Sequence, residues 1–438
     1  MGQAILDKSE IDKLPLGYTS FSEIKNDGVI YVDKTDLVSD LGRLKATPVF
    51  LSRPRRFGKS LLLSTFESLF SRGLKDFENL KIIKNDLESK DKFWHNEKTY
   101  KVIHLDFSRI ALKDVDEFES FLTIRFHLEL RGKNAWELTE AEKSVSYNSL
   151  LDSYSKENRG KDLVLLIDEY DSPITHSVDN PQKMKEMMDA VSSFFATIKS
   201  CEGMFRFVCI TGVTRLAHVS LFSMFNSLAD ITVNDKYSAL LGITEDELHE
   251  YFDTYVQNAA AVLDMIVSDV YARLKSTYNG FQFAINAQRT VYNPSSFMSF
   301  LRNPEQGFSN HWYSSGCDVP TLLVRYLRQK ANLKIFNLLL SKALNQNCDD
   351  SDERISLFGL CGDTALIGEY AIMSMPDKIP MNLLLYQTGC LTLKQTGKHR
   401  AKLVIPNDEV VESMILLSLD IRKLEPSEDV LSHDCSLA

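Results

Sequence analysis

The sequence has 438 residues, of which 44% are apolar and 25% charged, and its formal net charge is −10. This composition is typical of a globular protein with two or three domains, and the acidic balance disfavours a protein that coats nucleic acid over its whole surface. The seven cysteines include no C-x-x-C pair, which argues against a disulfide framework and a zinc site. No run of 18 apolar residues occurs, so we expect a cytoplasmic protein without a membrane span.

Short apolar runs alternate with longer amphipathic segments through the first 240 residues or so. This alternation predicts a mainly parallel sheet covered by helices, that is, an α/β core. The expected strands are 48–52, 101–107, 163–168, 205–211 and 229–233, and the clearest expected helices are 60–71, 115–130 and 182–200.

The pattern changes after Gly242. Helical spacing of apolar residues follows, with a capping run at 244–247 and Gly280 as a stop signal. We therefore predict four parts: an N-terminal segment packing on the core at 1–45, the core at 46–242, a helical lid at 243–330 and a C-terminal domain at 331–438, whose polar tail 424–438 should fray.

The stretch SRPRRFGKS, residues 52–60, lies between an expected strand and an expected helix. A phosphate-binding loop has this position, because loop N–H groups and the following helix N-terminus both face an anion. Lys59 would reach the β and γ phosphates of a nucleotide, Ser60 would place its hydroxyl on Mg²⁺, and Gly58 would permit close approach. Arg53 stands where the first glycine is expected, so an exposed basic loop is the alternative. We assign the whole loop to nucleotide binding: Arg53, Pro54, Arg55, Arg56, Phe57, Gly58, Lys59 and Ser60.

Two further expected strands end in polar residues. LVLLIDEYD places Asp168 and Glu169 at a strand end, where Asp168 suits Mg²⁺ binding and Glu169 suits polarisation of an attacking water. On the next strand, Thr211 and Arg215 are candidates for a γ-phosphate sensor and a charge stabiliser, with a polar loop cap and a surface arginine as the alternative. Open α/β sheets bind ligands at these carboxyl ends, and no N-K-x-D pattern occurs, so we favour ATP over GTP.

The chain resembles the AAA-ATPase-like family of P-loop proteins, which are often fused to a PD-(D/E)XK nuclease-like domain. In that family the loop is typically written R-P-R-R-F-G-K-[ST], without the leading glycine. The resemblance implies a P-loop NTPase core of the additional-strand (ASCE, AAA-like) type, a helical lid and a winged-helix-like C-terminal region. It rests on 14–35, 52–60, 165–174, 210–228, YNGFQF at 278–283, VYNPSSF at 291–297 and HWYSSG at 311–316.

The resemblance also assigns residues outside the loop. Asp33, Lys34 and Thr35 match a Y-V-D-K-T motif, for which we expect base or phosphate contact. Asp171, Arg215, Tyr278 and Gly280 match family positions, although the Tyr-Asn-Gly turn can equally shape the junction of lid and core. Residues 410–438 hold no room for the nuclease domain, so we expect no nuclease activity from this chain and any nuclease or effector on another chain.

A hairpin with a basic tip is predicted at 391–405. Such a tip fits a wing laid against DNA phosphates, and a solvated hairpin is the alternative. Its basic residues are Lys394, Lys398, His399, Arg400 and Lys402.

These observations predict an Mg-dependent protein that binds and hydrolyses ATP as a switch or motor, and the family resemblance suggests work for a mobile element or anti-phage defence. A non-hydrolysing nucleotide-dependent scaffold and a DNA-binding regulator are the alternatives. Ring-forming ATPases share sites between subunits, so a homo-oligomer is a further possibility, in which Arg55, Arg56 or Arg215 acts in cis or in trans.

Overall fold

A computed structural model is the basis for the fold. It describes residues 5–45, 47–108, 114–158, 160–177, 180–215, 227–284, 286–287, 289–314, 321–328, 330–344, 362–363, 381–397 and 400–423. Across these ranges, no helix is both long enough and apolar enough to cross a membrane.

A five-stranded parallel sheet forms the centre of the molecule, in the order β2-β3-β4-β1-β5. The prediction of an α/β core with a mainly parallel sheet is confirmed. All six residues of β3 are buried because helices cover both faces of the sheet. The strands are β1 (Val49–Ser52), β2 (Lys101–Asp106), β3 (Leu163–Asp168), β4 (Phe205–Gly212) and β5 (Ala229–Asp230), the last shorter than expected.

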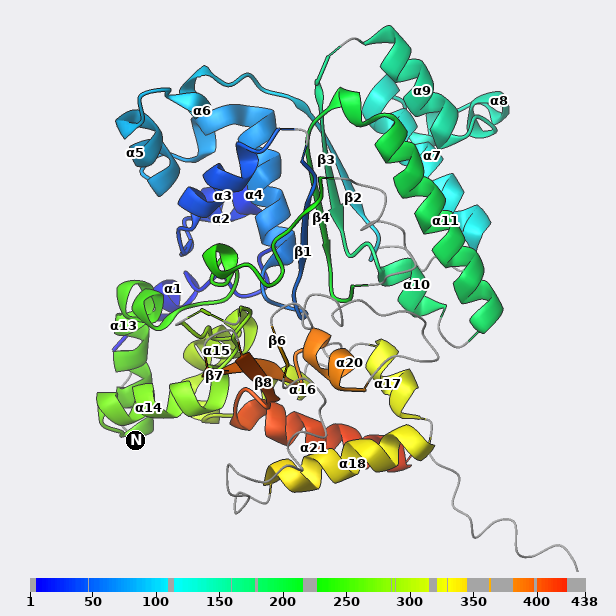
Figure 1. Cartoon of the computed structure of the whole chain (residues 1–438). Coiled ribbons are helices and arrows are strands. Elements are labelled where there is room, and N and C mark those ends of the chain that lie inside the picture. The colour runs from blue at the N-terminus through cyan, green and yellow to red at the C-terminus, as the bar shows by residue number, and fades with distance from the viewer. Residues whose placement is uncertain are drawn as a thin grey trace, which may run out of the picture.

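Two groups of helices flank the sheet (Figure 1). One group is α2 (Phe21–Asp27), α3 (Thr35–Gly42), α4 (Lys59–Arg72), α5 (Lys81–Glu88) and α6 (Phe93–Asn96). The other is α7 (Val115–Arg131), α8 (Glu140–Lys143), α9 (Tyr147–Glu157), α10 (Ser172–His176) and α11 (Pro181–Ser200).

The helices after β5 form a second buried cluster together with part of the N-terminal segment. They are α13 (Glu245–Leu263), α14 (Val267–Tyr278) and α15 (Pro294–Arg302). Thr244 and Glu247 close a capping box at the start of α13, which explains where this helix begins. Leu14, shortly after α1 (Lys8–Ile11), is buried among these helices, whereas Phe21 is buried in the sheet core. The N-terminal segment therefore packs on both the sheet and helices α13, α14 and α15.

The elements that follow α15 lie beside α13, α14 and α15, below the sheet in Figure 1. Their buried residues, such as Leu383 and Val410, belong to the same apolar cluster as the sheet. The predicted hairpin is confirmed: β7 and β8 pair antiparallel, and β6 adds a third strand. The predicted frayed tail 424–438 lies outside the described residues. The elements are α16 (His311–Ser314), α17 (Thr321–Leu327), α18 (Lys330–Leu344), β6 (Gly362–Asp363), α20 (Met381–Gln387), β7 (Thr392–Gly397), β8 (Arg400–Val404) and α21 (Asp408–Lys423).

Candidate functional site

The loop 53–58 connects the carboxyl end of β1 to the start of α4. Within it, Arg56 has φ +62° and Gly58 has φ +93°, so the chain turns through the left-handed region twice. Gly58 takes this conformation at little cost because it lacks a Cβ atom. The first N–H groups of α4 have no acceptor within the helix, and the helix dipole adds positive potential there. This end of α4 is therefore suited to bind a phosphate group.

Three oxygen-bearing side chains meet beside the loop. Ser60 Oγ donates to Asp168 Oδ2 at 2.5 Å, and Thr211 Oγ1 donates to Asp168 Oδ1 at 2.5 Å. They come from the start of α4 and from the carboxyl ends of β3 and β4, which are neighbouring parallel strands. Asp168 is buried, and its carboxylate is solvated by these hydroxyl groups and by the N–H of Glu169, which donates to Oδ1 at 3.0 Å. Hydroxyl and carboxylate oxygens are ligands suited to Mg²⁺, so Ser60 and Asp168 could hold this ion.

Lys59 and Glu169 lie next to this cluster. The Lys59 ammonium donates to the carbonyl oxygens of Arg53 at 3.1 Å and Pro54 at 3.2 Å, and its Nζ lies 3.8 Å from Glu169 Oε1. Glu169 has φ +48°, a strained conformation for a residue with a Cβ atom. Burial raises the pKa of the Glu169 carboxyl above its ordinary value, while the charges of Lys59 and Arg55 oppose this shift. Glu169 is thus a carboxylate whose environment favours proton uptake, as a general base requires.

A cavity of about 610 Å³ adjoins the loop and the start of α4. One end is polar and contains Lys59, Ser60 and Glu169. The rest is mostly apolar, and its walls come from the N-terminal segment, the chain before α13 and the start of α15. The apolar walls include Leu16, Ile30, Tyr31, Val38, Leu240 and Met298. A cavity with charged residues beside the loop and, apart from Lys34, mostly apolar walls elsewhere is suited to a nucleoside phosphate.

A protein family and a described protein are similar in sequence to this chain. The AAA-ATPase-like family, whose description is Predicted AAA-ATPase, matches residues 15–222. A protein of Azotobacter chroococcum mcd 1, described as an uncharacterized protein in the vnfD 5′ region, is 30% identical over 411 residues, which cover 92% of this chain and 69% of that protein. This chain belongs to the AAA-ATPase-like family. A crystal structure of Cdc6p from Pyrobaculum aerophilum is 10% identical in sequence to this chain. The alignment covers 96% of this chain and 99% of Cdc6p, and its TM-score of 0.27 is too low to support an argument.

The arginines of the AAA-ATPase-like loop have separate environments. Arg53 is buried, and its Nη1 donates to the carbonyl oxygens of Ser52 at 2.8 Å and Thr232 at 2.7 Å. Burial lowers the pKa of the Arg53 guanidinium to about 10, which leaves it charged at neutral pH. Arg56 is exposed at the cavity, where its Nη1 donates to Ser295 Oγ at 3.3 Å. Arg55 is half-buried and near enough to lower the pKa of Glu169. The loop therefore directs Arg53 into the core and Arg56 toward α15.

Arg215, a predicted charge stabiliser, pairs with protein groups in this structure. Its buried guanidinium forms an ion pair with Asp230 of β5, and its backbone N–H donates to Gln387 Oε1 at 3.2 Å. Arg215 is not among the residues that line the cavity. Thr211, from the same strand segment, does join Asp168 as described above. Of this predicted pair, the structure brings only Thr211 directly to the Ser60 and Asp168 cluster.

The Y-V-D-K-T motif uses its polar side chains to hold chain segments together. The Asp33 carboxylate accepts hydrogen bonds from the N–H and hydroxyl of Thr35 at 2.9 and 2.7 Å and from the N–H of Lys81 at 2.7 Å. Lys34 lines the cavity, but its ammonium donates to the carbonyl oxygens of Ala239 and Gly242 and pairs with Glu247 at 3.1 Å. Burial lowers the pKa of Lys34. Both predicted contact residues are thus committed to protein partners.

Two other family positions, Asp171 and Gly280, make contacts that hold chain segments in place. Asp171 is buried and accepts from the N–H groups of Val213 and Thr214 at 3.2 and 2.7 Å, which fixes the chain after β4. Gly280 lies so close to the chain at Pro406 that an added Cβ would stand 2.1 Å from the Pro406 carbonyl oxygen. These contacts agree with a structural role for the Tyr-Asn-Gly turn at the junction of the lid and the C-terminal elements.

Sequence reasoning missed most of the cavity wall. Residues 15–19 and 240–243 and the start of α15 line it, yet none was assigned a role. The signal was present, because LPLGYTSF and VYNPSSF lie within family motifs. Without the tertiary structure, however, nothing in these apolar and small residues distinguishes a cavity wall from a core.

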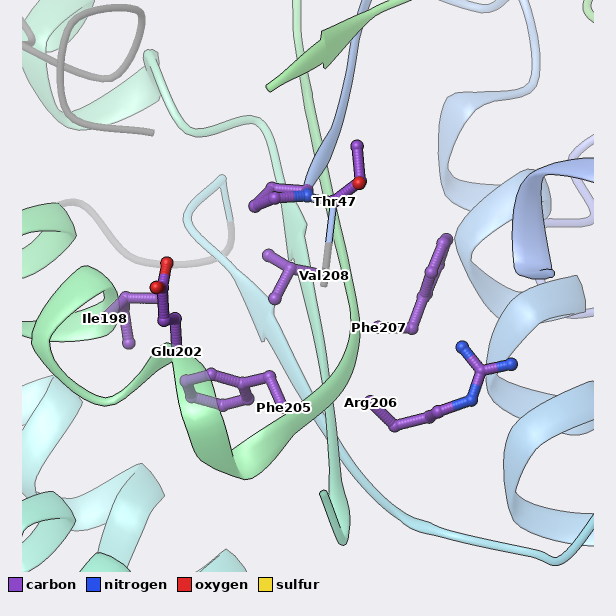
Figure 2. A pocket seen from close by; sticks show the side chains of 8 residues that line it. Thr47, Ile198, Glu202, Phe205, Arg206, Phe207 and Val208 are labelled. Carbon is purple, nitrogen blue, oxygen red and sulfur yellow. The ribbon is translucent and has the colours of Figure 1, made fainter. Parts of the chain in front are cut away.

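A second, smaller pocket of about 20 Å³ lies at the amino ends of β1 and β4, the opposite edge of the sheet from the loop (Figure 2). Thr47, Phe205 and Phe207 line it, and the Arg206 side chain extends to one side. Arg206 donates to the carbonyl oxygens of Gly42 and Leu44 and pairs with Glu97. Because its volume is far below that of a nucleotide, this pocket is not a competing ligand site.

Proposed function

We propose that this AAA-ATPase-like protein binds ATP with Mg²⁺ in the 610 Å³ cavity and hydrolyses it. The observation that carries the proposal is the meeting of Ser60, Asp168 and Thr211 within hydrogen-bond distance, directly beside Lys59 at the start of α4. A basic surface loop would not need a buried carboxylate held by hydroxyls from two other elements. This arrangement therefore favours a nucleotide site over the alternative of a solvated basic loop.

Each proposed role follows from local chemistry. Lys59 would exchange the loop carbonyls for phosphate oxygens, and Ser60 and Asp168 would hold Mg²⁺. The ion, when bound, neutralises developing charge on the phosphates. Glu169 would orient and deprotonate the attacking water, because its raised pKa makes it a better base than an ordinary carboxylate. Thr211 would report on the γ phosphate through its hydroxyl, and Arg215 would stabilise charge only if its guanidinium leaves Asp230.

The apolar end of the cavity is proposed to hold the adenine. Leu16, Tyr31 and Leu240 are among its walls, and apolar walls suit a base that stacks through its faces. Asp33 and Lys34 would then shape this end indirectly, through their bonds to protein groups. The lack of an N-K-x-D sequence supports ATP over GTP.

Two substitutions test the proposal on the full chain. Lys59→Ala should weaken binding of a fluorescent ATP analogue by on the order of a hundredfold, because a charge-assisted contact to phosphate is lost. Glu169→Gln should keep ATP affinity and reduce phosphate release by a factor on the order of 10² to 10⁴. Unchanged affinity in Lys59→Ala would overturn the binding proposal. Unchanged phosphate release in Glu169→Gln would overturn hydrolysis and leave the nucleotide-dependent scaffold.

A DNA-binding regulator is the second candidate, with the C-terminal region acting as a winged-helix-like module. The observation that favours it is the register of the hairpin, in which Lys394 of β7 lies opposite Lys402 of β8. Lys398 lies outside the described residues, and Arg400 is described only as part of β8. If this hairpin contacts phosphates, DNA affinity should fall steeply with salt, and charge reversal at Lys394 and Lys402 should flatten that dependence. An unaltered salt slope would contradict DNA contact through the hairpin.

The wider biological setting is proposed from the family resemblance alone. We propose a cytoplasmic switch or motor that serves a mobile element or anti-phage defence, with any nuclease or effector on a separate chain. We retain the four-part division at residues 45, 242 and 330 as part of this proposal. A homo-oligomer that forms with ATP would change the mass measured by light scattering, whereas a monomer at every nucleotide concentration would exclude arginines that act in trans.

A further inference from the structure

The phosphate loop contacts two segments from beyond the sheet. The first is 281–283, within the YNGFQF motif, and the second is 386–389, at the end of α20. They are joined through Thr392, whose Oγ1 accepts from the N–H of Gln282 at 2.7 Å and donates to the Gln282 carbonyl at 3.1 Å. We name these two segments together the platform.

Two aromatic residues of the platform contact the loop. The Arg53 guanidinium lies 4.2 Å above the centre of the Phe283 ring, a cation–π arrangement. The Phe57 ring packs edge-on against Phe281 and Phe283, with centroids 5.0 and 5.2 Å apart. Both ends of the loop are therefore fixed against the same short segment.

The closest approach joins Pro54 of the loop to Gly389 of the platform. A Cβ atom added to Gly389 would lie 2.9 Å from Pro54 Cβ and 3.0 Å from Pro54 Cγ, closer than such atoms pack. Gly389 also has φ +88°, which favours glycine. The loop that lacks its own first glycine thus packs against a glycine from the C-terminal part of the chain.

The contact matters for the site because of what Arg53 and Pro54 hold. Their two carbonyl oxygens accept hydrogen bonds from Lys59, so a shift of Pro54 moves the position of the Lys59 ammonium. Gln387 of the platform also accepts the N–H of Arg215, which lies just after β4. We propose that the platform is part of the nucleotide site, and that Gly389 and Phe283 are positioning residues that set the loop, and through it Lys59, for ATP. This inference rests on the proposed function, and it adds residues 281–283 and 386–389 to the site.

A matched pair of glycine substitutions tests the proposal in the full chain. Gly389→Ala should raise the Kd of mant-ATP with Mg²⁺ by on the order of tenfold, since small misplacements of binding groups are costly. Gly132→Ala is the control: Gly132 has φ +70°, yet nothing lies within 4 Å of its added Cβ. It should lower the melting temperature through backbone strain alone, by less than Gly389→Ala, and leave the Kd unchanged. In the double variant Pro54→Gly with Gly389→Ala, the clash is absent, so the Kd should return to within about twofold of Pro54→Gly alone.

A second pair keeps the test valid if Gly389→Ala does not fold. Phe283→Leu removes the ring beneath Arg53 and should raise the Kd several-fold, whereas Phe283→Tyr keeps the ring and should restore binding. A parent-like Kd in both Gly389→Ala and Phe283→Leu, alongside weak binding by Lys59→Ala, would overturn the platform and leave the proposed function intact. If the parent itself does not bind mant-ATP and Lys59→Ala changes nothing, the proposed function fails and the platform proposal fails with it.

Discussion

Lys59 in the loop and Lys34 in the N-terminal segment line the same cavity and have partners of the same kinds. Each ammonium donates to two main-chain carbonyls and lies beside one glutamate, Glu169 for Lys59 and Glu247 for Lys34. The carbonyls that Lys59 contacts are five and six residues away along the chain, whereas those of Lys34 are 205 and 208 residues away.

This difference distinguishes Lys59, which we propose binds phosphate, from Lys34, which joins parts of the fold. Lys59 can exchange the carbonyls of Arg53 and Pro54 for phosphate oxygens, and no contact between distant segments of the chain is lost. Lys34 joins the N-terminal segment to the chain before α13, and Glu247 is itself engaged in the cap of that helix. Both lysines line one cavity and were predicted to bind the nucleotide, and we expect different roles for them because their partners lie at different distances along the chain.

The largest expected effect sharpens this comparison directly. Lys34→Met keeps the apolar stem but leaves Glu247 and two carbonyls without the ammonium, so we expect a loss of about 3 kcal/mol in the free energy of unfolding. Lys59→Met should lose about 1 kcal/mol or less, because its partners are local. Urea unfolding at neutral pH measures both. Equal losses in the two variants would contradict the assignment of Lys34 to structure.

Asp33 provides a smaller effect of the same kind. Asp33→Ala leaves the N–H groups of Thr35 and Lys81 without their acceptor, which should cost about 2 kcal/mol of stability. The affinity of the folded protein for ATP should not change. Asp36→Ala, in the first turn of α3, is the control, with an expected loss of about 0.5 kcal/mol. A specific loss of ATP affinity in Asp33→Ala, with stability retained, would show that Asp33 takes part in nucleotide binding.

The smallest expected effect concerns the pH dependence of stability at Glu169. Burial raises its pKa in the folded state, so its ionised form is disfavoured there. Its contribution to stability is therefore greatest in acid and falls as pH rises through the folded-state pKa. Glu169→Gln carries no charge, so its stability relative to the parent should rise as the pH increases from the ordinary glutamate range, about pH 4, through the raised folded-state pKa. Denaturant unfolding at several pH values measures this difference, and a difference that does not vary with pH would contradict the raised pKa.

The predictions that held share a local origin. The strands, the loop and the helices could be predicted because an apolar run, a phosphate-loop motif and a helical repeat each occupy a short stretch of sequence. The meeting of Ser60 and Asp168 also followed, because parallel strands end at one edge of a sheet. Arg215 shows the limit: its partner Asp230 lies on the far side of β1 from β4, and no spacing rule connects the two.

The sequence by itself determined the α/β core, the position of the phosphate loop and the strand-end carboxylates, since these depend on periodicity and short motifs. Only the tertiary structure decided which charged side chains face the cavity and which are held by the protein. Arg53, Lys34 and Arg215 are alike as cations in the sequence, but each has partners from distant segments. The energy of a buried charge depends on those partners, and long-range packing alone brings them together.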